Sequence, residues 1–109
     1  MKVKEHVLSI IDDIENGLDI NEYEEAKEEE REPNGFDFIK DALDIEYIIG
    51  SNGDYRGARI LVSFGGPNIW INTKRSVVEG YWWGDNCEFS YNDNIGLNDA
   101  VEELFECTR

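Results

Sequence analysis

Residues 45–91, IEYIIGSNGDYRGARILVSFGGPNIWINTKRSVVEGYWWGDNCEFSY, decide the fold class. Short runs rich in Ile, Val, Tyr and Trp alternate there with turn-forming residues, a pattern typical of β-strands joined by tight turns. The predicted strands are residues 45–49, 58–64, 69–73, 77–83 and 87–91. Their links hold only a few residues each, whereas parallel strands need crossovers of about a dozen or more. The sequence therefore predicts a five-stranded antiparallel meander.

Helices are predicted both before and after the meander along the sequence. Apolar residues recur at three- and four-residue spacing before Asn16-Gly17, which predicts a helix over 3–16. A short helix is predicted over 36–43, and a C-terminal helix over 95–107 with Asn94 or Asn98 as its N-cap. Residues 19–34 are too acidic to distinguish a solvated helix from a loop. The expected architecture is a single α+β domain spanning 1–109, in which helices cover one face of the sheet.

The charge balance narrows the partners. The chain has 25 Asp and Glu against 10 Lys and Arg, a formal charge of −15. Such a field repels nucleic acid and anionic membranes, and it speeds encounter with basic protein surfaces. We therefore expect a basic protein as partner, with no direct nucleic-acid or membrane binding. The N-terminus does not resemble a secretory signal, and the two cysteines, Cys87 and Cys107, do not form a disulfide framework, so we expect a cytoplasmic protein.

An acidic run lies between the first two predicted helices. It comprises Glu22, Glu24, Glu25, Glu28, Glu29, Glu30 and Glu32. One interpretation is an ordinary solvated surface that keeps the protein soluble. The other is a mimic of the phosphate backbone, in which spaced carboxylates occupy a groove whose Lys and Arg normally contact phosphates. The sequence leaves both open.

Tryptophans on the predicted sheet form a second candidate surface. Because strand side chains alternate, Trp82 and Trp83 are predicted to point to opposite faces. Trp70 and Trp82, with Asp85 on a polar rim, could anchor a partner on the open face. The alternative is that these aromatic side chains serve the core.

No pattern for catalysis, a metal or a cofactor is recognisable. His6 is the only histidine and has no nucleophile beside it, and a calcium loop aligned on Gly96 would place Tyr91 and Ile95, which offer no carboxylate, at ligand positions. We therefore expect a non-enzymatic protein without a cofactor. The oligomeric state stays open.

The stretch from Ile60 to Asp85 resembles segments of small acidic proteins of bacterial phages and other mobile elements. In size and charge the chain is similar to anti-CRISPR and antirestriction inhibitors, which implies an inhibitor that binds a nuclease. Two alternatives stay open: an immunity protein or antitoxin against a nuclease toxin, and a small-ligand or peptide binder that uses the open sheet face.

Overall fold

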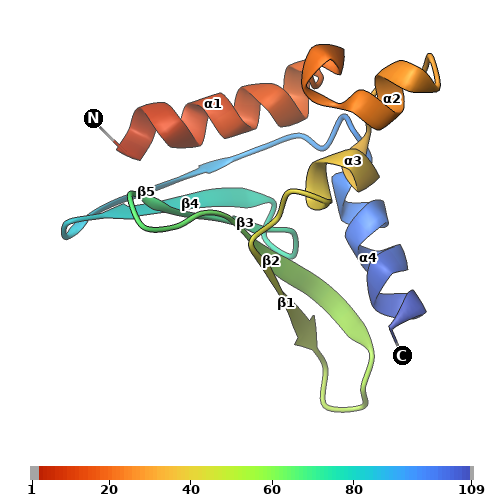
Figure 1. Ribbon diagram of the computed structural model, residues 1–109. Helices are drawn as coiled ribbons and strands as arrows, with labels where there is room; N and C mark the ends of the chain where they lie inside the picture. Colours follow the sequence, from red (N-terminus) through yellow and green to blue (C-terminus); the bar gives the residue numbers. More distant parts are fainter. Residues whose placement is uncertain (1–2, 109) are drawn as a thin grey trace.

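The sheet is a five-stranded antiparallel meander in the order β1-β2-β3-β4-β5, so the predicted α+β class is confirmed. A computed structural model describes residues 3–108, and Figure 1 shows the helices gathered on one side of this sheet. The strands are β1 Asp44–Ile49, β2 Tyr55–Ser63, β3 Asn68–Asn72, β4 Val77–Trp82 and β5 Asp85–Ser90.

The helical elements are shorter than predicted except for the first. They are α1 Val3–Asn16, the 3-10 turn η1 Ile20–Glu22, α2 Glu24–Glu28, α3 Gly35–Ile39 and α4 Leu97–Cys107. The segment left open as acidic helix or loop is therefore a mixture of η1, α2 and turns. In Figure 1, α1 runs beside β4 and β5, whereas α4 lies beside β2.

The core lies between the helices and one face of the sheet. Alternate strand residues, among them Ile60, Ile71 and Val78, are fully buried there. From α1, Val7 and Ile14 are fully buried against them. Apolar side chains recur every second residue in the strands and about every 3.6 residues in the helix. Each element therefore has one apolar face, and the two faces pack against each other.

Gly80 allows α1 to approach β4 closely. A Cβ atom built on Gly80 would lie 2.6 Å from a methyl carbon of Val3 and 2.6 Å from a methyl carbon of Val7. Any larger residue would therefore push the helix away from the strand.

The cap of α4 differs from the prediction. Gly96 is the residue before the helix, and the carboxylate of Asp93 accepts hydrogen bonds from the backbone N–H groups of Leu97 and Asn98 at 2.8 Å each. The side chain of Asn94 instead donates to the carbonyl of Glu15 at 2.9 Å. The predicted N-caps Asn94 and Asn98 are therefore wrong, because a carboxylate earlier in the loop reaches the free amides of the first turn.

The β4–β5 hairpin also differs from the prediction. Its turn is the pair Trp83-Gly84, with φ of 50° and 81°, rather than residues 84–86. Asp85 and Asn86 therefore belong to β5 and pair with Trp82 and Tyr81. Because Trp83 lies outside the strand, alternation does not apply to it, and its ring contacts Trp82 edge-to-face at 5.7 Å between centroids. The prediction that the two indoles point to opposite faces is wrong.

Candidate protein-binding surfaces

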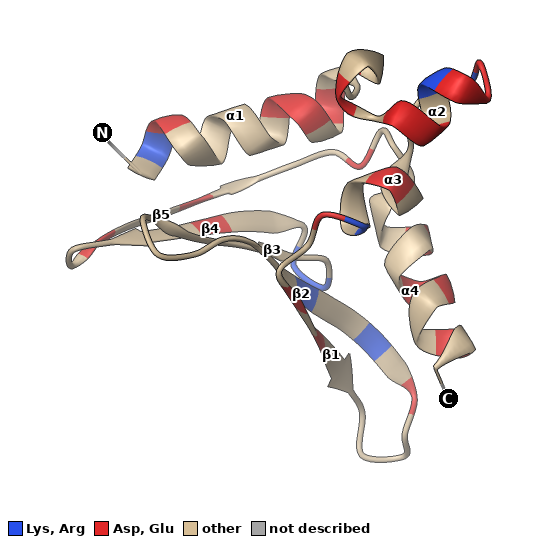
Figure 2. Cartoon of the chain, in the orientation of Figure 1, with Lys and Arg blue, Asp and Glu red and all other residues tan. Residues whose placement is uncertain are grey.

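The predicted acidic run lies on the surface at one corner of the molecule. Glu22 belongs to η1, three glutamates belong to α2, and the others follow in the turns before Pro33, as Figure 2 shows by the acidic residues gathered around α2. All seven side chains are exposed. Because α2 has five residues, no long helix displays them in a row.

A buried ion pair fixes this acidic segment to the fold. The two terminal guanidinium nitrogens of Arg31, Nη1 and Nη2, donate to the carboxylate of Asp37 at 2.7 and 3.1 Å, and the Asp37 side chain is only 3% exposed. The backbone N–H of Asn34 donates to the same carboxylate at 2.8 Å, completing a capping box at the start of α3. The hydrogen bonds from Arg31 lower the pKa of Asp37 below its ordinary value. The acidic segment is therefore held in place by an ion pair between Arg31, which lies within the segment, and Asp37 of α3.

Only some carboxylates of the run are neutralised locally. Glu29 pairs with Arg31 at 2.9 Å, and Glu25 pairs with Lys40. Within residues 3–108, the remaining members make no ion pair. These are Glu22, Glu24, Glu28, Glu30 and Glu32.

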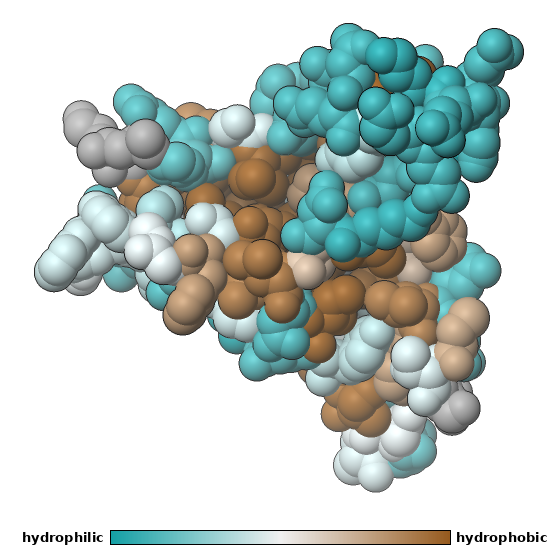
Figure 3. All heavy atoms as spheres, in the orientation of Figure 1, coloured by the Kyte–Doolittle hydropathy of each residue, from teal (hydrophilic) through white to brown (hydrophobic). Residues whose placement is uncertain are grey.

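A groove opens beside these unpaired carboxylates, between α1 and α3. Its apolar lining comes from Ile10, Tyr23, Phe38 and Val62, with Asp13 and Asp41 at its rim. An adjoining hollow shares Tyr23 and Asp41 and extends the rim to Glu22, Glu24, Glu25, Asp37 and Lys40. We call the two together the α1–α3 groove. Figure 3 shows apolar surface directly beside the hydrophilic surface of the acidic corner.

The pKa shifts of two groove residues reflect burial first and neighbouring negative charge second. Burial, followed by the charges of Glu22 and Asp12, raises the pKa of Asp13 above its ordinary value. Burial, followed by the charges of Asp41 and Asp13, raises the pKa of Tyr23 to about 12. A cation placed in the groove would offset the part of each shift that the neighbouring carboxylates cause.

The face of the sheet opposite the helices carries a network of ion pairs. Glu79 is 6% exposed, and it accepts from Arg59 at 3.2 Å and from Arg75 at 3.3 Å. Arg59 also lies over the ring of Trp70, with its guanidinium carbon 4.3 Å from the centroid. Trp70 therefore lies on the open face of the sheet, as its predicted role as a partner anchor requires. The guanidinium of Arg59, however, already covers its ring.

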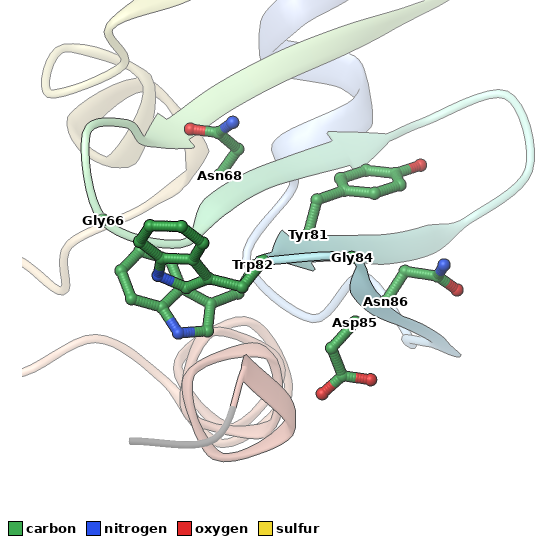
Figure 4. A pocket seen from close by; sticks show the side chains of 8 residues that line it. Gly66, Asn68, Tyr81, Trp82, Gly84, Asp85 and Asn86 are labelled. Atoms are coloured by element: carbon green, nitrogen blue, oxygen red, sulfur yellow. The ribbon is translucent and has the colours of Figure 1, made fainter.

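The other two predicted anchors, Trp82 and Asp85, lie at the β4–β5 end of the sheet. Trp82 is half-buried against the core, and Asp85 is exposed. Both line a hollow of 320 Å³ that includes Gly66 and Tyr81, and Figure 4 shows Trp82 close to Gly66, with the Tyr81 ring pointing away from them. The structure thus brings Trp82 and Asp85 together, but it separates them from both Trp70 and the acidic run.

The sequence reasoning missed the apolar half of the α1–α3 groove. Tyr23 is an aromatic residue within an acidic stretch, Phe38 and Asp41 lie in the helix predicted over 36–43, and Val62 lies in the strand predicted over 58–64. An aromatic residue isolated among carboxylates was the one available signal. Its neighbours come from distant parts of the chain, so no local pattern points to them.

No protein-family model, curated protein or solved structure matches this chain. The resemblance of residues 60–85 to phage proteins therefore stays a prediction. Between residues 3 and 108, no helix is both long and apolar enough to cross a membrane. In the same part of the chain, no three His, Cys, Asp or Glu side chains are grouped so as to hold a metal ion.

Proposed function

We propose that this protein is a cytoplasmic inhibitor that binds a basic, nucleic-acid-binding surface of a nucleic-acid-processing enzyme, such as a CRISPR or restriction nuclease. The observation that carries this proposal is the α1–α3 groove, where an apolar floor lies beside four carboxylates that make no ion pair within residues 3–108: Asp13, Asp41, Glu22 and Glu24. Lys and Arg side chains combine an apolar stem with a cationic head. A strip of them would pack its stems on Tyr23 and Phe38 and place its charges beside Asp13 and Asp41.

The anchoring of the acidic corner supports the same partner. Arg31 and Asp37 hold the segment in place before any partner arrives, so little ordering entropy opposes binding. The formal charge of −15 would accelerate encounter with a basic channel. Surfaces that bind nucleic acid are rich in Lys and Arg, so their charge is complementary to that of the acidic segment.

An immunity protein or antitoxin against a nuclease toxin would use the same electrostatics and is the nearest alternative. The open sheet face is less suited to bind a ligand around Trp70, because Arg59 already lies over that ring.

The test is competition with nucleic acid on purified enzymes. A fluorescent DNA or RNA is bound to each of several CRISPR effectors, restriction nucleases and basic nuclease toxins, and its anisotropy is followed as this protein is added. We expect displacement from at least one enzyme, weakening about tenfold or more between roughly 50 and 200 mM salt.

Two triple variants with the same change in charge locate the surface. E22Q/E24Q/E28Q neutralises three unpaired carboxylates of the acidic run, of which Glu22 and Glu24 line the groove, whereas D99N/E102Q/E103Q neutralises three exposed carboxylates on α4. The first variant should displace nucleic acid about tenfold more weakly, and the second should stay near the wild type. Equal losses in both would reduce the effect to net charge and refute the proposed surface.

A further inference from the structure

Trp83 occupies an unusual position. Its side chain is 86% exposed, and its backbone adopts φ of 50° in the two-residue turn between β4 and β5. Such turns favour Asn or Gly at this position, since a bulky residue with positive φ is strained by roughly 1 kcal/mol or more. An indole that is both strained and exposed contributes little to folding. A strained residue of this kind is typical of a binding site.

The surroundings of Trp83 form a site with aromatic walls. Its ring meets that of Trp82 at 86°, with centroids 5.7 Å apart, so the two indoles make a corner. They line the 320 Å³ hollow together with Tyr81, which is 43% exposed. This volume is at the lower end of the range of about 300–1,000 Å³ for small-molecule sites.

The polar groups of the hollow are acidic or neutral. Asp85, Asn68 and Asn86 line it, and none of the Lys and Arg residues within 3–108 does. Within residues 3–108 Asp85 makes no ion pair. Asp85 pairs with Trp82 across the β4–β5 hairpin, and Figure 4 shows its carboxylate and the amide of Asn86 pointing in different directions. An anionic ligand would find no positive partner here, whereas a cation would find a free carboxylate.

We propose that this hollow binds an alkylated ammonium group, of the kind carried by choline or by a trimethylated lysine. The faces of aromatic rings are electron-rich and attract such cations, whose methyl groups also gain from leaving water. Asp85 supplies the opposite charge, and the net charge of −15 raises the local concentration of cations. The site shares no lining residue with the α1–α3 groove and does not depend on the proposed inhibitor function.

The experiment is an NMR titration that follows the indole N–H signals of the isotope-labelled protein. The probes are choline, a short peptide with trimethyl-lysine, and the same peptide with unmodified lysine. Two neutral probes complete the set: the carbon isostere of choline, in which a tert-butyl group replaces trimethylammonium, and maltotriose. We expect about tenfold tighter binding in at least one of two comparisons: choline against its neutral isostere, or the trimethyl-lysine peptide against the peptide with unmodified lysine. The tighter of the two identifies a free small molecule or a modified protein as the source.

Three variants locate the binding. W83A should weaken it about tenfold and D85N several-fold, with the Trp82 indole as the reporter in W83A. F64A is the matched control, because Phe64 is another exposed aromatic residue, at 72%, that does not line the hollow. The proposal would be overturned if choline and its isostere bound equally well, or if maltotriose saturated the site and choline did not. It would also be overturned if neither cation shifted the signals up to about 50 mM, or if W83A bound as tightly as the wild type.

Discussion

Replacing Asp37 by Asn tests whether one buried ion pair holds the acidic corner. The substitution keeps the shape of the side chain and removes its charge, so the amide can no longer accept from Arg31 through two oxygens. Hydrogen bonds to a charged group contribute about 1.5–3 kcal/mol each, and Arg31 is partly solvated. We expect a loss of about 2 kcal/mol in the free energy of unfolding. For a domain of this size that lowers the melting temperature by roughly 8–16 °C.

The Asp54–Arg56 pair provides the control. It has a 2.7 Å contact like that of Arg31 with Asp37, but both of its side chains are about half exposed. D54N should therefore change the free energy of unfolding by less than about 0.5 kcal/mol. Hydrogen exchange adds a local readout, because the N–H of Arg31 donates to the carbonyl of Ala26 within the acidic segment. D37N should speed its exchange, and D54N should not.

The pH dependence has a defined sign. Because the folded state lowers the pKa of Asp37, its stabilisation is complete above the unfolded value of about 4 and is lost as pH falls through the folded value. The gap in stability between the wild type and D37N should therefore narrow as pH falls below about 4. A gap that is the same at every pH, or a D37N variant as stable as D54N at about pH 7, would refute this account of the corner.

Four further substitutions probe the sheet and its β4–β5 turn. G80A should destabilise the protein by about 1–2 kcal/mol, because overpacking against Val3 and Val7 outweighs the strand preference of Ala over Gly. G66A is the control, because its added Cβ would lie an ordinary 3.9 Å from Trp82. Its free energy of unfolding, measured by denaturant titration, should stay within about 0.5 kcal/mol of the wild type. If G80A and G66A were equally stable, the close packing of α1 on β4 would be contradicted. W83N and W83A both lose the Trp82 contact, so their difference isolates the backbone. Since Asn tolerates φ of 50° better, W83N should be more stable by about 1 kcal/mol, and a more stable W83A in thermal melts would show that the turn is unstrained.

The strands and the first helix could be predicted because their signals are local. Alternation along residues 69–73 places Ile69 and Ile71 on one face, and this requires no knowledge of the partner strands. The helix over 3–16 follows in the same way from its apolar spacing. The acidic run was also visible, since it is a matter of composition.

The β4–β5 turn marks the limit of such signals. Gly84, Asp85 and Asn86 are all common turn residues, so local chemistry allowed a turn at 84–86. Pairing of Val78 with Phe89 and of Gly80 with Cys87 sets the register, because these residues must face the core together. That requirement moves the turn to Trp83-Gly84 and places two indoles in contact.

By itself, then, the sequence determined the meander, the covering helices and the surplus of negative charge, because strand alternation, helical periodicity and composition are properties of neighbouring residues. Only the tertiary structure decided which side chains meet across the chain. Val62 lies beside Tyr23 in the α1–α3 groove, Arg59 covers Trp70, and Asp37 binds Arg31. These contacts depend on how packed layers bring distant segments together, and no local pattern carries that information.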